Sequence, residues 1–225
     1  MAAQDDIREK EIIQRFNLKQ EPDRVRHGTD AILNLDGQLI EFELKSVTTA
    51  KGGLSTVRDL GRNHIEKWRG KHWIIAFYDK SGQLANCKYA TPDDMSPWIE
   101  QIWSYIEPDF RIAEICSGFC NLEALHHVVG AKELYTLEDA KKLHKKQYTA
   151  KKYLDAMDLK DGYSPARMLE IFKDRVRYVI ERGSTLNNPH IQASYFNNQP
   201  DIKEEHAETL RKLIRNWLHL KEAPL

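Results

Sequence analysis

The sequence lacks several features that would point to a function directly. It has no net charge, because its 34 basic and 34 acidic residues balance, so the field of the whole protein favours neither nucleic acids nor anionic membranes. Long apolar runs are also missing: HWIIAFY is far shorter than the roughly 20 residues that a membrane span needs. The N-terminus, MAAQDDIREKEI, is too charged for a signal peptide. We therefore expect a cytoplasmic protein without a membrane segment, in which any surface for nucleic acid is local.

Cysteine is scarce as well. The three cysteines, Cys87, Cys116 and Cys120, are an odd number without the spacing of a disulfide scaffold, which fits a reducing compartment. Two of them lie close in sequence to His126 and His127, but this spacing matches no standard zinc pattern. We therefore interpret them as buried cysteines beside ordinary histidines.

No internal repeat or low-complexity segment divides the chain. Its 225 residues are enough for one substantial core, and we expect a single domain over residues 1–225. Period-two patterns come early and helical patterns come later, which predicts a mixed α+β (α/β) fold. In this fold a small mixed sheet lies within residues 1–90, a helical elaboration covers 91–185, and a loop with a C-terminal helix covers 186–225.

Local signals place the individual elements. Helical spacing predicts a helix over residues 5–17, a second one behind Ser55 in GLSTVRDLGRNHIEKWRG, and a last one over about 201–220. The apolar run at 72–78, the turn DKSG and residues 83–90 predict a pair of strands. Further helices are expected to begin at Ser96-Pro97, at Thr136 with Asp139 in a capping box, and at Ser164-Pro165, the last of them ending at Gly183.

The stretch TDAILNLDGQLIEFELKSVT, residues 29–48, predicts a β-hairpin. Asp36-Gly37 is the turn signal, because a type I′ turn requires positive φ at both central residues. Side chains alternate between the two faces of each strand. The apolar face then comprises Ala31, Leu33, Leu35, Ile40, Phe42 and Leu44, and the other face carries Asp30, Ile32, Glu41, Glu43 and Lys45.

The charged face of this hairpin requires a cation. The register sets Asp30 opposite Glu43, and like charges in opposed positions, with Cβ atoms roughly 5 Å apart, destabilise a strand pair. Two carboxylates at this separation can share Mg²⁺, which keeps waters that a phosphate can displace. Lys45, about 7 Å further along the same face, could hold or help to deprotonate an attacking water. The alternative is a solvated polar face, on which Lys45 merely screens Glu43.

The motif and its surroundings resemble a known group of enzymes. Asp30 with Glu43-x-Lys45 resembles the active site of PD-(D/E)xK nucleases, and the wider neighbourhood resembles the PvuII-type restriction endonucleases. The matching segments are Arg26-His27-Gly28-Thr29-Asp30-Ala31, Gly37-Gln38, Glu43-Leu44-Lys45-Ser46, Lys51-Gly52, Ser55-Thr56, Lys67-Trp68-Arg69, Trp73-Ile74-Ile75-Ala76-Phe77-Tyr78 and Asn187-Asn188-Pro189-His190-Ile191. The resemblance implies a restriction-endonuclease-like core with a helical C-terminal half.

The resemblance also implies roles for the site residues. Asp30 and Glu43 would bind Mg²⁺ together with the Leu44 carbonyl, and Mn²⁺ would substitute for it. Lys45 would be the catalytic lysine. The protein would be a homodimer that recognises a palindrome in double-stranded DNA.

DNA contacts are expected from two segments far apart in the sequence. An asparagine amide can accept from N6 and donate to N7 of adenine, and a guanidinium can donate to both O6 and N7 of guanine. After Ser55-Thr56 the family has consecutive histidines, which are replaced here by Val57-Arg58-Asp59, so we expect a different recognition sequence. The predicted DNA-contacting residues are Ser55, Arg58, Arg62, Asn187, Asn188 and His190.

A second basic segment lies outside these motifs. Lysines stand at positions 141, 142, 145, 146, 151 and 152 with no acidic residue between them. Such a run could line a helix that faces phosphates, or it could be an ordinary solvated face.

The sequence thus predicts a Mg²⁺-dependent type II restriction endonuclease, a site-specific phosphodiester hydrolase of a restriction-modification system. One alternative is a PD-(D/E)xK nuclease that acts in DNA repair or on branched DNA. Another is a DNA-binding relative that has lost catalysis.

Overall fold

The computed structural model describes residues 4–20, 28–49, 52–186 and 188–222. The chain divides into two compact units, which we call the sheet unit (Met1–Trp103 with Leu186–Leu225) and the helical unit (Ser104–Thr185). The elements of the sheet unit are α1 (Gln4–Arg15), β1 (Ala31–Leu35), β2 (Gln38–Thr48), β3 (Gly53–Ser55), α2 (Arg62–Trp68), β4 (His72–Tyr78), β5 (Leu84–Ala90), the first part of α3 (Pro92–Gly118), β6 (His190–Gln192), the short helix η1 (Ala193–Phe196), β7 (Asp201–Ile202) and α8 (His206–Glu222). The helical unit contains the rest of α3 and the helices α4 (Leu122–Val129), α5 (Leu137–His144), α6 (Ala150–Asp155) and α7 (Pro165–Gly183).

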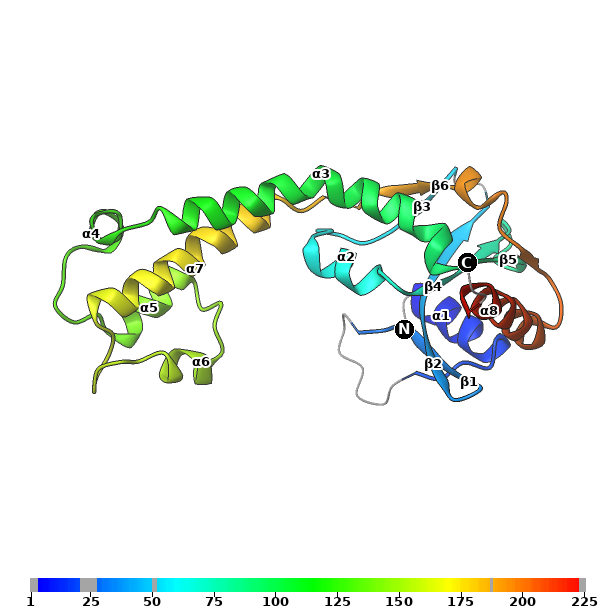
Figure 1. Ribbon diagram of the computed structural model, residues 1–225, viewed down its shortest axis with the longest axis horizontal. Coiled ribbons are helices and arrows are strands. Elements are labelled where there is room, and N and C mark those ends of the chain that lie inside the picture. The colour runs from blue at the N-terminus through cyan, green and yellow to red at the C-terminus, as the bar shows by residue number, and fades with distance from the viewer. Residues whose placement is uncertain (1–3, 21–27, 50–51, 187, 223–225) are drawn as a thin grey trace. The chain divides into compact units, whose positions relative to one another are not determined.

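The sheet unit is built on a five-stranded sheet with the strand order β1-β2-β4-β5-β7 (Figure 1). β2 and β4 are parallel, whereas the other neighbouring strands are antiparallel. β3 and β6 form a separate antiparallel pair. The predicted small mixed sheet with flanking helices is therefore confirmed, but its last strand, β7, comes from outside the predicted range of residues 1–90.

The predicted hairpin at the start of the sheet is present with the expected register. Leu35 pairs with Gln38, and Ala31 pairs with Phe42. The turn residue Asp36 has φ of 54° and Gly37 has φ of 85°, as a type I′ turn requires. All the side chains of the predicted apolar face are buried in one core.

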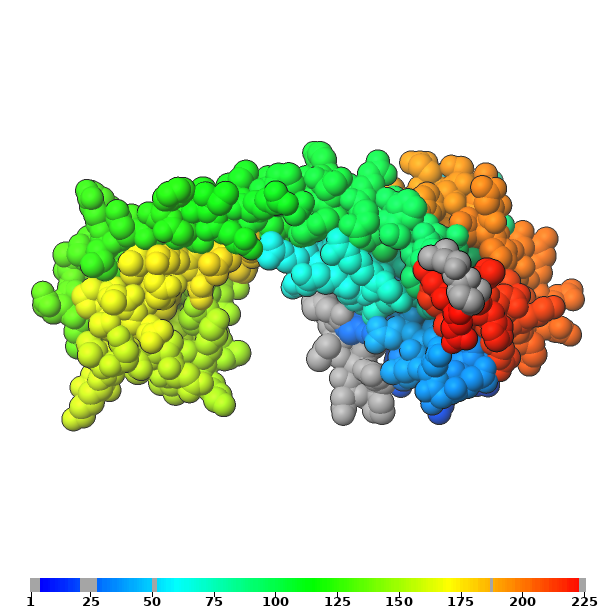
Figure 2. Space-filling view, in the orientation of Figure 1, coloured from blue at the N-terminus to red at the C-terminus, as the bar shows by residue number. Residues whose placement is uncertain are grey.

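Helices α1 and α8 cover this apolar face. Phe16, which follows α1, and Ile214 of α8 are both fully buried in the same core as the strands. Figure 2 shows α8, near the C-terminus, beside the β1–β2 hairpin. A hydrogen bond joins the two elements, in which Arg215 Nε of α8 donates to Asp36 Oδ2 of the hairpin turn at 2.7 Å. Segments from the two ends of the chain thus enclose one side of the sheet.

A tryptophan cluster occupies the opposite face. Trp73 of β4 lies 5.3 Å, between ring centroids, from Trp68 of α2. Trp68 in turn lies 5.7 Å from Trp98 of α3. Because side chains alternate along a strand, Trp73 faces these helices while its neighbour Ile74 enters the core with α1 and α8. This cluster fixes the position of α2, which carries a residue of the site.

The prediction of a helix beginning behind Ser55 was wrong. Gly53–Ser55 is strand β3, and α2 begins only after Gly61. The physical reason is long-range pairing, since Leu54 is buried opposite Ile191 of β6.

Two other helix starts also differ from the prediction. α3 begins at Pro92 rather than at Ser96, because Thr91 and Asp94 form a reciprocal cap in which the Thr91 N–H donates to Asp94 and the Asp94 N–H donates to Thr91 Oγ1. The last helix begins at His206, because Asp201–Ile202 pairs with β5 instead.

The helical unit has its own core. The predicted capping box of Thr136 and Asp139 begins α5, and the predicted Ser164 cap begins α7, which ends at Gly183. Side chains of α4, α5, α6 and α7 pack together through Leu125, Tyr135, Ala140, Leu143, Tyr153, Tyr163, Met168, Ile171 and Phe172.

Candidate active site

Two buried carboxylates define the site. Asp30 directly precedes β1, and its N–H donates to the carbonyl of Phe42 at 3.3 Å. Glu43 lies on β2, opposite Trp73 of β4. Asp30 is 5% exposed and Glu43 is 1% exposed. Two carboxylates that are removed from water in this way require cationic partners.

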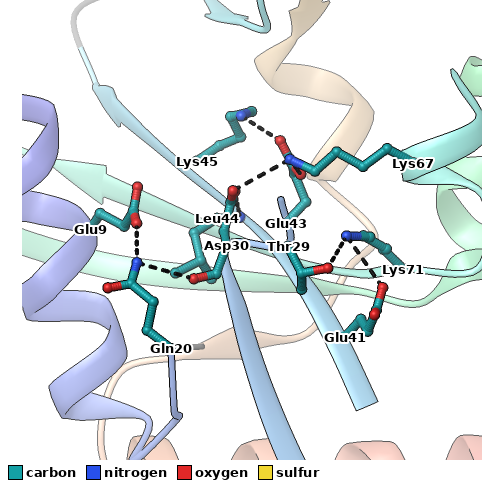
Figure 3. Close-up of polar contacts among 10 residues, drawn as sticks. All are labelled: Glu9, Gln20, Thr29, Asp30, Glu41, Glu43, Leu44, Lys45, Lys67 and Lys71. Carbon is teal, nitrogen blue, oxygen red and sulfur yellow. Dashed lines mark hydrogen bonds and ion pairs between the residues drawn. The ribbon is translucent and has the colours of Figure 1, made fainter. Parts of the chain in front are cut away.

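The chain itself supplies two lysines as partners. Lys45 Nζ lies 2.7 Å from Glu43 Oε1. Lys67 Nζ lies 2.9 Å from Glu43 Oε2 and 3.4 Å from Asp30 Oδ1. Figure 3 shows the ammonium of Lys67 in contact with both carboxylates. The predicted need for positive charge beside this acid pair is therefore met, in the structure, by a lysine of α2.

A backbone hydrogen bond orients the first carboxylate. The Leu44 N–H donates to Asp30 Oδ2 at 2.9 Å (Figure 3). Since Leu44 follows Glu43 on β2, this bond fixes Asp30 relative to Glu43 and leaves Asp30 Oδ1 facing Lys67.

The ionisation of these groups is set by burial and by their neighbours. Burial alone would raise the pKa of the Glu43 carboxyl, but Lys45 and Lys67 outweigh burial and hold this pKa well below its usual range. Burial alone would lower the pKa of Lys45, but the carboxylates of Glu43 and Asp30 outweigh it and raise this pKa. At neutral pH the cluster therefore holds an ionised glutamate and a protonated Lys45.

The donor set fits an oxygen-preferring divalent cation. Glu43 Oε2 is buried without a hydrogen-bond partner, although Lys67 lies beside it as an ion-pair partner. Within the described ranges, no group of three or more His, Cys, Asp or Glu side chains could hold a metal. The protein would thus contribute two carboxylates, and water, backbone carbonyl or substrate oxygens would complete the shell, as Mg²⁺ commonly accepts.

The cluster opens into a cavity of about 550 Å³. Both carboxylates and both lysines line it. The remaining lining residues come from α1, β2, the β3 region and α2: Asp5, Arg8, Glu9, Ile12, Leu44, Ser46, Val47, Thr48, Gly53, Ser55, Thr56, Val57 and His64. A phosphate group that enters this cavity would meet the acid–lysine cluster directly.

The structure brings together residues that the sequence separates by more than 130 positions. Ser55 of β3 lies opposite His190 of β6, and both are exposed. Thr56 Oγ1 donates to the carbonyl of Pro189 at 2.6 Å, next to Asn188, whose φ is 53°. The two predicted DNA-contacting segments therefore form one surface, and Ser55 also lines the cavity.

The other predicted DNA contacts are distributed around α2. Arg58 is exposed in the turn before this helix. Arg62 is the first residue of α2, and its guanidinium carbon lies 5.9 Å from the centroid of the Trp103 ring. Asn187 lies outside the residues that the structure describes. DNA contact by these residues stays a prediction.

The cysteines take no part in this site. Cys87 is buried, whereas Cys116 is exposed and Cys120 is partly exposed. The expectation that Cys116 and Cys120 are buried is therefore wrong for Cys116, which is exposed on α3, and Cys120 is only partly buried. None of the helices in the described part of the chain is both long enough and apolar enough to span a membrane.

The mixed sheet, with buried carboxylates and a lysine on one of its strands, is the arrangement expected of a metal-dependent nuclease. Comparison with known families agrees with this class. Residues 4–110 match the family model of restriction endonuclease PvuII. The resemblance to PvuII-type restriction endonucleases and the restriction-endonuclease-like fold are thereby confirmed, and the match supports a DNA-binding hydrolase. A search of curated proteins found no match.

Lys67 is the main feature of the site that sequence reasoning missed. It occurs in the segment Lys67-Trp68-Arg69 that resembles the family, but no local spacing links it to residues 30 and 43. Only the packing of Trp68 against Trp73 places α2 so that the preceding lysine reaches the acid pair.

Proposed function

We propose that the protein is a Mg²⁺-dependent type II restriction endonuclease, which cleaves double-stranded DNA at a short palindromic sequence. The observation that carries this proposal is the buried pair of Asp30 and Glu43 with Lys45 on the wall of one cavity. The family match over residues 4–110 supports it.

In this proposal, each residue of the cluster has a defined task. Asp30 and Glu43, with the Leu44 carbonyl, hold Mg²⁺, and Mn²⁺ substitutes for it. The bound ion would stabilise charge on the phosphate oxygens and on the leaving group. Lys45, which is protonated at neutral pH, would hold the attacking water near the scissile bond and offset the charge of the phosphate, and the proton of the water would leave to the solvent. The products carry 5′-phosphate and 3′-hydroxyl ends.

Sequence recognition is assigned to the surface beside this cavity. Ser55 lies opposite His190 there, Asn188 stands two residues before His190, and Arg58 and Arg62 follow Ser55 in the chain. We propose that this surface reads base edges, and that two copies of the chain act as a homodimer so that each copy cuts one strand of the palindrome.

The decisive experiment is cleavage of a large, fully sequenced phage DNA. The purified protein is incubated with this DNA and Mg²⁺, with EDTA in a parallel reaction. Discrete metal-dependent fragments, whose ends share one sequence, are expected. Nicks or cuts confined to branched DNA would instead favour a repair nuclease, and metal-independent binding without cleavage would favour an inactive relative.

Matched variants assign the activity to the acid pair. Asp30→Asn and Glu43→Gln should each reduce cleavage by at least about a thousandfold, a loss comparable to that of a principal electrostatic group in other active sites, while DNA binding persists. Glu41→Gln is the control, because Glu41 is partly exposed on the same strand and pairs with Lys71 instead. Full cleavage by Asp30→Asn would overturn the assignment.

A further inference from the structure

A concentrated basic surface lies in the helical unit, which falls almost entirely outside the family match. Five lysines are exposed on α5, on α6 and in the turn between them, and we call them the lysine surface: Lys142, Lys145, Lys146, Lys151 and Lys152. One expectation from the sequence was a lysine run along a helix that faces phosphates, but the structure folds the run around the turn between α5 and α6. The charges thereby lie on the second half of α5, in the turn and on the first half of α6.

These lysines are not neutralised by acidic side chains. In the same unit, Lys132 pairs with Asp139 at 2.7 Å and Lys173 pairs with Glu170 at 2.9 Å. By contrast, none of the five lysines of the lysine surface forms an ion pair with any residue that the structure describes. An ordinary solvated helix face usually alternates charges of both signs, so this surface is arranged differently.

The turn itself adopts an unusual backbone conformation. Lys145 and Lys146 are consecutive and both left-handed, with φ of 53° and 57°. Residues with a Cβ seldom occupy this region, and such strain tends to persist where it serves a function. Its effect here is to reverse the chain within a few residues, so that both lysines and the first turn of α6 face solvent.

A cavity of about 260 Å³ lies between the two helices at this surface. Its lining includes Lys141, Lys146, Tyr148 and Tyr153, together with Glu138, which pairs with Lys141 at 3.2 Å. Lys152 Nζ lies 3.8 Å from the centroid of the Tyr148 ring.

One residue of the cavity lining, Tyr153, has a hydrogen-bond donor without a partner. Tyr153 is 2% exposed, and its hydroxyl is buried with no hydrogen-bond partner in the described structure. Buried hydroxyl groups normally have a partner. A phosphate in the cavity would lie beside Lys141 and Lys146, and a small shift of the lining would let one of its oxygens accept a hydrogen bond from this hydroxyl.

We propose that the lysine surface binds the backbone of duplex DNA, with one phosphate in the cavity between α5 and α6. The helical unit thereby adds sequence-independent affinity to the nuclease. DNA is the occupant because the catalytic cluster of the same chain is proposed to cleave it, so the inference rests on the proposed function.

The test compares two variants of the full chain that lose the same charge. The surface variant carries Lys145→Gln, Lys146→Gln and Lys151→Gln. The control variant carries Lys80→Gln, Lys203→Gln and Lys212→Gln, which replace exposed lysines of the sheet unit. Binding of a fluorescent duplex is measured with Ca²⁺ in place of Mg²⁺ over a range of salt concentrations.

The salt dependence of duplex binding shows whether the lysine surface contacts phosphates. Each lost phosphate contact lowers the slope of log affinity against log salt by about 0.9, so the surface variant should lose about 2 to 3 from this slope. The control variant should keep the wild-type slope. Equal slopes for the surface variant and the wild type would overturn the proposal.

The cavity is tested separately by Tyr153→Phe. This change removes only the unpaired hydroxyl, so it should leave the fold intact and weaken duplex binding by about tenfold. Unchanged duplex binding would exclude a phosphate that is held by the Tyr153 hydroxyl. Inorganic phosphate is tested alone: if it raises the thermal stability of the wild type while duplex binding ignores all these substitutions, the site takes free phosphate and the DNA proposal fails.

Cleavage distinguishes this inference from the proposed function. At saturating DNA and Mg²⁺, the surface variant should cleave at the wild-type rate, because its substitutions lie outside the catalytic unit. A wild type that neither binds nor cleaves DNA would refute the proposed function. A wild type that cleaves, with a surface variant that keeps the wild-type salt slope, would refute only the role of the lysine surface.

Discussion

Lys67 Nζ lies 2.9 Å from Glu43 Oε2, and the same ammonium lies 3.4 Å from Asp30 Oδ1. It thus contacts both of the carboxylates that we expect to share a metal ion. A divalent cation that binds there competes with this ammonium, because both are attracted to the same two oxygens. Lys67 stabilises the acid pair in the absence of metal, and it would have to shift if a metal bound there.

Replacing Lys67 should therefore separate metal affinity from metal-free stability. Lys67→Met should bind Ca²⁺ about tenfold more tightly without DNA, a gain of about 1.4 kcal/mol, because its competitor is gone. The metal-free variant should lose about 3 kcal/mol of stability, because two buried carboxylates lose a partner, and added Ca²⁺ should restore it. Isothermal titration and urea unfolding measure the two effects.

A second buried lysine provides the control for this experiment. Lys71 is 4% exposed and contacts Thr29 and Glu41, not the acid pair. Lys71→Met should destabilise the protein without increasing its affinity for Ca²⁺. Weaker Ca²⁺ binding by Lys67→Met would show that Lys67 supports the metal site and does not compete with it.

Two glycines with different backbone conformations, Gly37 in the hairpin turn and Gly183 in α7, predict opposite changes in stability. Gly37 has φ of 85° and open space around it, so Gly37→Ala should destabilise the protein by about 1 kcal/mol through backbone strain alone. Gly183, at the end of α7, has no left-handed φ and also has open space. Gly183→Ala should stabilise the protein by about 0.5 kcal/mol. Thermal unfolding of both variants checks the signs, and equal destabilisation would contradict the turn assignment.

Features that depend on local sequence were predicted correctly, whereas features that depend on contacts between distant residues were not. The hairpin depends on Asp36-Gly37 and on the alternation around it, which are local, so its register and buried face were predicted. The β3–β6 pair and the approach of Lys67 depend on residues far apart in the sequence. No periodicity within Gly53–Ser55 indicates that Ile191 will cover Leu54, and therefore a helix was predicted where a strand forms.

His72 should make stability depend on pH. It is 3% exposed, its Nδ1 lies 2.6 Å from the Tyr89 hydroxyl, and burial lowers its pKa to about 4. The unfolded chain, with an ordinary pKa of about 6.5, takes up the proton first as the pH falls. His72 therefore contributes fully to the free energy of unfolding above pH 6.5, and this contribution is lost as the pH falls from about 6.5 to about 4. The loss amounts to about 3 kcal/mol at most.

The measurement is urea unfolding at pH 7 and pH 4.5. The double variant His72→Phe with Tyr89→Phe removes the titrating group and leaves no hydroxyl without a partner, so it should lose about 2 kcal/mol less on acidification than the wild type does. Tyr89→Phe alone keeps His72 and should retain the wild-type pH dependence. An identical pH dependence in the double variant would contradict the role of His72.

The pairing of Ser55 with His190 predicts where sequence recognition resides. His190 is exposed opposite Ser55, which lines the catalytic cavity. If His190 contacts a base edge, His190→Ala should weaken binding to the cognate site by about 10- to 100-fold, which is 1–3 kcal/mol. Binding to unrelated DNA and the salt slope should hardly change, because phosphate contacts govern both.

Competition assays with cognate and scrambled duplexes measure the difference. The control is His219→Ala, which alters an exposed histidine of α8. A uniform loss of affinity for both duplexes would identify His190 as a backbone contact, and recognition would then have to come from the other residues of the proposed surface: Ser55, Arg58, Arg62 and Asn188.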